Sequence, residues 1–175
     1  MTALTAHRLL AFVVDYFLII LYAVLLFLLA WLFLGTDSFS YLQDNHLLNQ
    51  LITFTTMTLP VFMYFFLFET SKWNGTPGKK IFGIRVISNQ PFQKRKIFMR
   101  NFIKFLPWEI SNIGVIWSFN YTNTGTEIPI WIWLLLLLPQ GVYIFYLTSI
   151  IYYKGESSFY DKIANTAIAG KNNLA

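Results

Sequence analysis

One stretch of the chain, residues 9–34, reads LLAFVVDYFLIILYAVLLFLLAWLFL and contains a single charged residue, Asp15. About 20 consecutive apolar residues are enough for an α-helix to cross the hydrocarbon core of a bilayer. A secretory signal peptide has a shorter apolar region of roughly 7 to 15 residues, followed by small residues at a cleavage site. Residues 9–34 therefore predict a membrane-spanning helix that is retained in the mature chain.

Three further stretches extend this prediction to a helix bundle. Residues 48–69 are uncharged up to Glu69, and residues 130–153 carry no charge, so each has the length and polarity of a span. Residues 103–120 are a weaker candidate, because Lys104 and Glu109 lie in their first half. We predict an all-α polytopic membrane bundle of four transmembrane helices, over about 9–34, 48–69, 103–120 and 130–153, in one domain over 1–175.

The composition supports a membrane protein and excludes several kinds of site. The chain has 175 residues, of which 56% are hydrophobic and 12% charged, and this charged share is about half that of a typical soluble domain. It has no cysteine, which excludes disulfides, thiolate metal sites and cysteine nucleophiles. The two histidines, His7 and His46, have no neighbouring ligand residues. We therefore expect no metal site, no cofactor and no enzymatic activity.

The cations are concentrated in one segment. Nine of the 13 Lys and Arg residues lie between Lys72 and Lys104. Because Lys and Arg accumulate in short cytoplasmic loops, this distribution predicts four spans, cytoplasmic N and C termini, and a basic cytoplasmic loop over 70–102. We expect anionic lipid headgroups at that loop and no nucleic-acid partner, since membrane orientation already accounts for the cations. The tryptophans fit this topology, with Trp31, Trp117, Trp131 and Trp133 at the outer interface and Trp73 and Trp108 at the inner one.

The basic loop contains a distinctive turn, Gly75-Thr76-Pro77-Gly78-Lys79. Two glycines around a proline favour a tight turn. A phosphate-binding loop requires a glycine five residues before its Gly-Lys pair and a Ser or Thr after it. Trp73 and Lys80 occupy those positions here, so we exclude a nucleotide loop. Residues 81–87 are rich in β-branched side chains and are expected to form a short strand or a strip at the headgroup level.

Three segments together carry a resemblance to a known family. They are Arg8-Leu9-Leu10-Ala11 leading to Asp15, then Gly75 to Lys79, and then Asp161-Lys162-Ile163-Ala164-Asn165-Thr166. By these segments the chain resembles the RDD family of bacterial membrane proteins. The resemblance implies that Arg8, Asp15 and Asp161 are the arginine and two aspartates for which the family is named, and that the turn residues and Thr166 have structural or functional roles. Where the family commonly has glycine before the threonine, this chain has Asn165, which also adopts a left-handed turn.

The resemblance implies a multi-pass protein of the bacterial cytoplasmic membrane, and monovalent-cation/proton antiport has been attributed to some members. The residues themselves leave two hypotheses for the ionisable groups, which are costly inside a bilayer. Asp15, Glu109, Asn112 and Gln140 are candidates for a polar path for ions or protons. Alternatively, Asp15 pairs with Lys104 or Arg100, and Arg8 with Asp161 or Glu69, as a structural clamp.

Two functions are therefore open. The first is a monovalent cation/proton antiporter or other small-solute transporter. The second is a non-transporting accessory or assembly protein of the membrane. Four helices are few for a transporter, so a transporting form is expected to be a homo-oligomer, although no G-x-x-x-G motif occurs within a span.

Overall fold

The computed structural model describes residues 2–34, 45–88 and 93–170. In chain order the elements are α1 (Ala3–Leu34), α3 (His46–Thr53), the π-helix η1 (Phe54–Thr58), α4 (Leu59–Thr70), α5 (Pro77–Ile81), β1 (Ile84–Ile87), α6 (Gln93–Asn123), α7 (Ile130–Tyr152), α8 (Phe159–Ile163) and β2 (Ala167–Gly170). The predicted outer connection after residue 34 lies partly outside these residues, and the cation Lys171 lies outside them.

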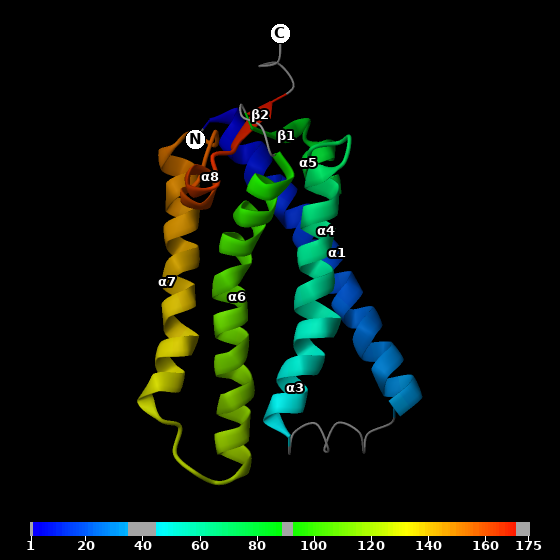
Figure 1. The fold of residues 1–175 in the computed structure, drawn as a ribbon, viewed down its shortest axis with the longest axis vertical. Helices are drawn as coiled ribbons and strands as arrows, with labels where there is room; N and C mark the ends of the chain where they lie inside the picture. The colour runs from blue at the N-terminus through cyan, green and yellow to red at the C-terminus, as the bar shows by residue number, and fades with distance from the viewer. Residues whose placement is uncertain (1, 35–44, 89–92, 171–175) are drawn as a thin grey trace.

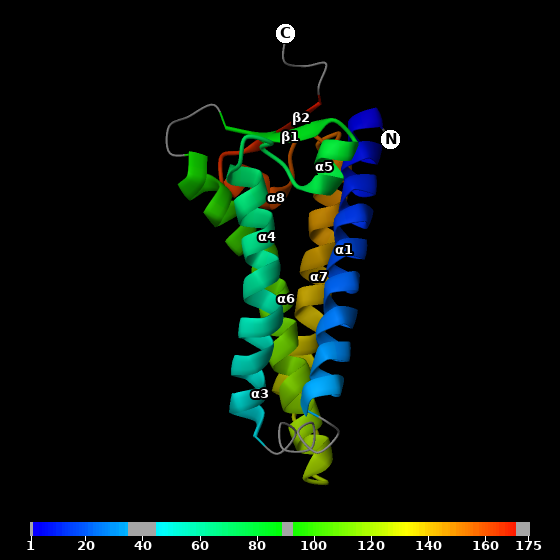
Figure 2. The same ribbon diagram turned by 90° about the vertical axis from the view of Figure 1, so that its right-hand side faces the viewer.

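Four long helical segments run along the molecule and alternate in direction (Figure 1). These are α1, the continuous segment α3, η1 and α4, then α6 and α7. The short elements α5, α8, β1 and β2 gather at one end, and we call these four elements the cap. The first turn of α1 and the end of β2 lie at the cap as well, as Figures 1 and 2 show. Helix α1 is inclined to the other three, and its far end diverges from α4 (Figure 1).

Three helical segments are long and apolar enough to cross a membrane: Ala3–Phe33, His46–Thr70 and Ile130–Tyr152. They correspond to three of the four predicted spans, and the prediction of a mostly helical membrane protein is confirmed. The weakest predicted span, 103–120, lies within α6, which is not among the three. The predicted loop over 70–102 is more ordered than expected, since it contains α5, β1 and the first turns of α6.

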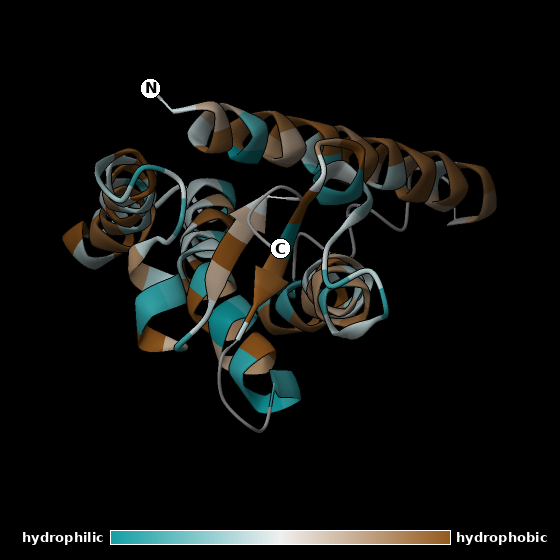
Figure 3. Ribbon diagram, turned by 90° about the horizontal axis from the view of Figure 1, so that it is seen from above, coloured by the Kyte–Doolittle hydropathy of each residue, from teal (hydrophilic) through white to brown (hydrophobic). Residues whose placement is uncertain are grey.

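The cap contains a small two-stranded sheet that the all-α prediction does not include. β1 and β2 pair antiparallel, with Ile84 opposite Gly170 and Val86 opposite Ile168. Side chains alternate between the two faces of a strand, so Ile84 and Val86 are both buried while Arg85 between them is half-exposed. They pack with Ala11, Ile97 and Ile168 into a core beneath the sheet. Seen from above, the strands lie between the surrounding helices (Figure 3).

Prolines inside two of the long helical segments free backbone carbonyls, and tyrosines from neighbouring helices bind them. Pro60 has no N–H to donate to the carbonyl of Thr56, and that oxygen accepts a 2.7 Å hydrogen bond from the Tyr22 hydroxyl of α1. In the same way Pro107 frees the carbonyl of Ile103, which accepts from the Tyr146 hydroxyl of α7 at 3.1 Å. These bonds join α1 to η1 and α6 to α7.

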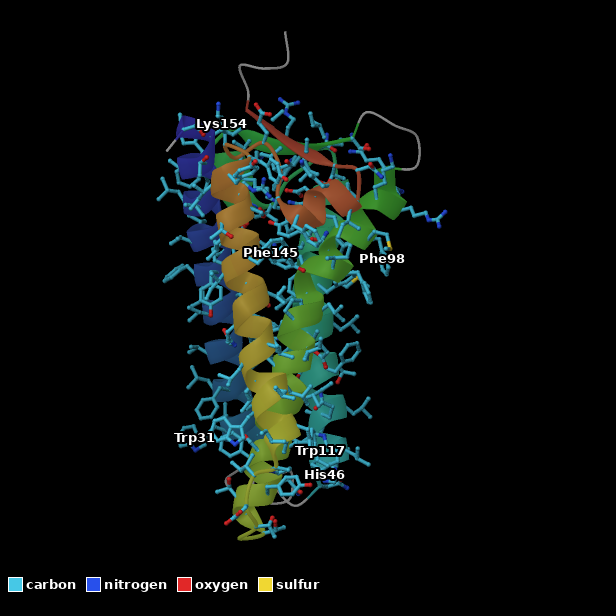
Figure 4. The ribbon with its side chains drawn as sticks, turned by 90° about the vertical axis from the view of Figure 1, so that its left-hand side faces the viewer. Trp31, His46, Phe98, Trp117, Phe145 and Lys154 are labelled. Carbon is cyan, nitrogen blue, oxygen red and sulfur yellow. The ribbon has the colours of Figure 1, made fainter. Side chains whose placement is uncertain are left out.

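The end opposite the cap is rich in aromatic rings. His46 lies 4.4 Å from Trp117, and Trp117 lies 5.6 Å from Trp131, measured between ring centroids. Figure 4 shows Trp31, His46 and Trp117 at this end and Lys154 at the cap. Rings that combine an apolar body with a polar atom are typical of a membrane interface.

Candidate functional site

Five buried charged side chains of alternating sign join two elements of the cap to three of the long helical segments. We call them the ionic chain, and in order of contact they are Arg8 of α1, Asp161 of α8, Arg100 of α6, Glu69 of α4 and Lys79 of α5. Each of these side chains is less than 10% exposed. Charges so deeply buried are tolerated only when they are paired and hydrogen-bonded.

Asp161 is the first carboxylate of the ionic chain and joins Arg8 to Arg100. It is paired with Arg8, accepts from the Arg100 Nε at 2.5 Å, and accepts from the Ser158 backbone N–H at 2.9 Å. Ser158 in turn caps α8, so the bond belongs to a capping box. Burial alone would raise the pKa of Asp161, but the guanidinium groups of Arg100 and Arg8 lower that pKa to about 2. Asp161 is therefore ionised at neutral pH.

Glu69 is the second carboxylate of the ionic chain. Both of its oxygens lie 2.6 Å from the Arg100 Nη1, and it is also paired with Lys79. The Asn101 amide donates to it at 3.0 Å. Burial lowers the pKa of the Lys79 ammonium, and the charge of Glu69 opposes that shift. Arg100 thus bridges both carboxylates, and it is fully buried by them and by the ring of Tyr160.

Asp15 binds the glycine-rich turn rather than either Lys104 or Arg100. Its carboxylate accepts from the Gly78 backbone N–H at 3.0 Å and from the hydroxyls of Thr76 and Tyr64. All three donors are neutral, and Asp15 is 2% exposed. Gly78 is required for this approach, because a Cβ there would lie 2.3 Å from the carbonyl of Ala11. The contact joins α1 to the start of α5.

The rest of the turn has clear structural reasons as well. Thr76 caps α5 by accepting from the Lys79 backbone N–H, and Pro77 occupies the first helical position, where its missing N–H costs nothing. A Cβ at Gly75 would lie 3.1 Å from the Cβ of Lys79. The turn therefore positions one end of the ionic chain.

A second polar cluster lies deeper, where α6 faces η1. Glu109 accepts from the Gln50 amide at 3.0 Å through Oε1 and from the Thr58 hydroxyl at 2.8 Å through Oε2. The indole N–H of Trp108, two turns of α6 beyond Arg100, donates to Thr58 at 3.3 Å, so Trp108 lies deeper than the interface where the sequence placed it. We call Gln50, Thr58 and Glu109 the Glu109 pocket. Among the described residues no cation is paired with this carboxylate.

Two buried polar atoms beside Glu109 have no hydrogen-bond partner among the described residues. They are the Gln50 Oε1, on the amide that binds Glu109, and the Asn112 Nδ2, one helical turn further along α6. Gln140, by contrast, is exposed on α7. Of the four residues named for a polar path, the structure thus places Glu109 and Asn112 next to each other, Asp15 at the cap, and Gln140 apart.

Within the described residues no group of three or more His, Cys, Asp or Glu side chains is placed to hold a metal ion. The remaining cation of the interior is Lys104, whose ammonium lies 3.4 Å from the ring centroid of Phe65. This geometry is a cation–π contact and not the expected pair with Asp15.

A comparison with family models gives a match to the RDD family over residues 2–165. The chain belongs to the RDD family. No curated protein and no solved structure matches it. In this RDD protein Arg8 and Asp161, two of the three residues that the resemblance assigned to the family pattern, form a direct ion pair, while the third, Asp15, binds the glycine-rich turn.

The tail of the family pattern is also explained by the structure of this RDD protein. Asn165 has a φ of 52°, which is the left-handed conformation expected where the family commonly has glycine. Its turn allows the Thr166 backbone N–H to donate to the carbonyl of Asp161 at 2.9 Å. The left-handed Asn165 therefore completes the end of α8.

Several residues of these clusters were not singled out from the sequence. Glu69 was named from the sequence only as an alternative partner of Arg8, whereas it binds Arg100 and Lys79. The roles of Tyr64, Gln50 and Thr58 were missed. One signal pointed to Glu69, because it is the acidic residue nearest to Lys79 in the sequence.

Proposed function

We propose that this RDD protein exchanges a monovalent cation for a proton across the bacterial cytoplasmic membrane, with Glu109 as the exchanging group. One observation carries the proposal: the Glu109 carboxylate lies between helices, and among the described residues its hydrogen-bond donors are neutral, Gln50 and Thr58. A carboxylate is expensive in such a place unless its charge is neutralised. A proton and a cation are the two ways to neutralise it.

The chemistry of the pocket favours a monovalent ion. A single carboxylate is balanced by one positive charge, so a proton and one monovalent cation compete for the same site. A divalent cation would leave a net positive charge there. Gln50 Oε1, buried without a donor, supplies a further oxygen ligand beside Glu109, and oxygen atoms are the ligands of hard cations.

Asp15 has a different role in this proposal. Its carboxylate already accepts three hydrogen bonds that join α1 to α5 and α4, so we assign it to the structural clamp with Arg8 and Asp161. The proposal therefore places ion exchange at Glu109 and helix anchoring at Asp15, where the sequence alone offered both roles for Asp15.

The proposal includes a topology and an assembly. Helix α6 begins at the cap, where α4 ends, and returns to the opposite end, where α7 begins (Figure 1). Since the helices on either side of it are apolar enough to span, α6 is the fourth span, with both termini and the cap in the cytoplasm. We propose a homo-oligomer as the transporting form, since four helices offer little surface for a path, and no enzymatic activity.

Proton movement in everted membrane vesicles tests the function. A pH-sensitive dye reports proton release when Na⁺, Li⁺ or K⁺ is added to vesicles that contain the protein. We expect a cation-dependent signal that Glu109→Gln abolishes at matched abundance, because the amide cannot carry the charge. The matched control is Glu127→Gln, the same change on an exposed residue between α6 and α7, which should retain the signal. A Glu109→Gln variant with normal exchange would exclude this carboxylate from the reaction.

One observation favours the second candidate, a non-transporting accessory protein. Helix α1 exposes large apolar side chains along most of its length, including Phe17, Leu21 and Phe33. Such a helix can pack against another membrane protein as well as against lipid. Absence of any cation-dependent signal from folded wild-type protein, together with cross-linking of α1 to a second membrane protein, would favour the accessory function.

A further inference from the structure

The cap carries an excess of positive charge that the fold does not neutralise. From Thr70 to Trp108 the chain contains nine Lys and Arg residues and no Asp or Glu. Lys79 and Arg100 are neutralised inside the ionic chain. Four of the others are exposed and, among the described residues, are not paired with a carboxylate: Lys72, Lys80, Lys94 and Arg95.

Two segments far apart in sequence bring these cations to one corner of the cap. The Gln93 amide at the start of α6 donates to the Asn74 side chain at 3.1 Å. Asn74 has a φ of 49° and lies in the turn between α4 and α5. The Lys80 ammonium of α5 lies 3.6 Å from the ring centroid of Trp73 in that turn, and Trp73 is 46% exposed. The corner thus combines exposed cations with an interfacial aromatic ring.

An apolar strip continues directly from the cations at the start of α6. Lys94, Phe98 and Phe102 are spaced four residues apart, so they follow one face of the helix. Phe98 and Phe102 are 43% and 48% exposed, and Figure 4 shows Phe98 near the cap end of the molecule. The Phe98 ring packs against Phe62 and Phe66 of α4, with centroids 5.4 and 6.0 Å away.

We propose that this corner, formed by Lys72 and Trp73 of the α4–α5 turn, by Lys80 of α5, and by Lys94, Arg95, Phe98 and Phe102 of α6, binds an anionic phospholipid. The cations face the phosphate and the headgroup charge, and the phenylalanine strip faces an acyl chain. Basic residues beside a membrane helix attract anionic lipid, and here the helix face that begins at Lys94 and continues along Phe98 to Phe102 is about 12 Å long, at about 1.5 Å per residue.

The order of charge and apolar surface favours lipid over other anionic partners. A nucleic acid or an acidic soluble protein has charge to offer the cations but no apolar segment for Phe98 and Phe102 at membrane depth. A phospholipid offers both in the same order along the membrane normal. The inference does not depend on ion exchange at Glu109, which lies deeper on α6.

Lipid retention tests the site. Purified full-length protein in detergent is titrated with phosphatidylglycerol or with phosphatidylcholine of the same acyl chains, and retained lipid is counted by native mass spectrometry. The double variant Lys94→Gln/Arg95→Gln should weaken retention of phosphatidylglycerol by up to roughly thirtyfold at low ionic strength and leave phosphatidylcholine unchanged. The matched control, Lys154→Gln/Lys162→Gln, removes the same charge at the same end beside α7 and α8 and should behave as wild type.

A second variant tests the apolar half of the site. Phe98→Ala should reduce retention of both lipids, because it removes contact with the acyl chain and not with the headgroup. Equal loss in the two double variants would mean that only diffuse surface charge attracts lipid, and would overturn the proposal. Binding of glycerol phosphate as strong as that of the whole lipid, or RNA retained in place of lipid, would overturn it as well.

Discussion

Arg100 shows how a single side chain determines the order of the cap. It binds Glu69 and Asp161, two carboxylates 92 positions apart in the sequence, and both are fully buried. Removing one partner of a buried ion pair costs roughly 3 to 5 kcal/mol, because the other charge is left without compensation. The ionic chain therefore makes the arrangement of α4, α6 and α8 specific, even though each charge is expensive to bury.

The depressed pKa of Asp161 predicts acid sensitivity. Its ordinary pKa of 3.8 falls to about 2 in the folded protein, so its contribution to stability is fully present above pH 3.8. That contribution is lost as the pH falls from about 4 to 2, and it amounts to about 2 kcal/mol. Thermal unfolding in detergent should show this loss. Asp161→Asn should be less stable at pH 6 and should have a shallower pH dependence below pH 4, and an equally steep dependence in the variant would contradict the assignment.

Gly78 is predicted to be the least replaceable glycine that the structure describes in a helix. A Cβ at Gly78 would lie 2.3 Å from the Ala11 carbonyl and 2.8 Å from the Asp15 carboxylate, so Gly78→Ala must separate α5 from α1. We expect a destabilisation of roughly 1 to 3 kcal/mol, measured as a lower unfolding temperature. Gly141→Ala is the control, because nothing lies within 4 Å of a Cβ at that helical position. It should be neutral or slightly stabilising, and equal effects of the two changes would argue against a close α1–α5 contact.

At the scale of elements, the long helical segments of this protein tolerate proline because side chains from neighbouring helices satisfy the freed carbonyls. Water is absent from the bilayer core, so a free carbonyl there needs a protein partner. Tyr22 and Tyr146 supply that partner for Thr56 and Ile103. Pro60 and Pro107 therefore determine where a neighbouring helix attaches, rather than only bending their own helices.

A double-mutant cycle tests this pairing between α6 and α7. Tyr146→Phe leaves the Ile103 carbonyl unsatisfied and should cost about 1 kcal/mol in unfolding free energy. In the Pro107→Ala background the new N–H of residue 107 can donate to the same carbonyl, so Tyr146→Phe should cost clearly less. Tyr152→Phe, on a side chain that is 78% exposed, serves as the control. Equal costs in both backgrounds would show that the hydroxyl and the proline act independently.

The elements were predictable to the extent that hydropathy alone defines them. The three apolar helices follow from sequence, as does the left-handed Asn165. The strand over Ile84–Ile87 was one of two alternatives open for residues 81–87. Helix α6 was the hardest to predict, because its first turns are basic and extend beyond the apolar segment. The π-helix and the tyrosine partners of the prolines depend on how helices face each other, and periodicity does not encode that rotation.

The sequence predicted which residue types form the site better than it predicted which of those residues pair with each other. Arg8 with Asp161 was one of two pairings open from the sequence, and the structure selects it. One of the two hypotheses placed Asp15 beside a cation, but the start of α5 supplies the Gly78 N–H and the Thr76 hydroxyl, and α4 supplies the Tyr64 hydroxyl. Counting charges along the sequence does not predict neutral donors, because the fold brings them to Asp15.

At the scale of the whole molecule, the polar groups are divided between two depths. The ionic chain joins three of the four long helical segments near the cap, α1, α4 and α6, and α8 joins it to the end of α7 through the bond from the Phe159 N–H to Ser149. Toward the other end of the bundle, α1 is held by few contacts, such as the bond from Tyr22. The Glu109 pocket lies between α6, α3 and η1, away from the cap.

This arrangement predicts a definite topology, with α6 as a full span. The chain has no natural cysteine, so single cysteines give an unambiguous label. Thr124→Cys, exposed between α6 and α7, should react with a membrane-impermeant maleimide in intact spheroplasts. Glu156→Cys, exposed at the cap, should react only after the membrane is permeabilised. The positive charge of the cap requires this orientation, and α6 must cross the membrane to connect the two faces. Protection of Thr124→Cys in intact spheroplasts would place both ends of α6 on the same side and would remove the Glu109 pocket from the membrane interior.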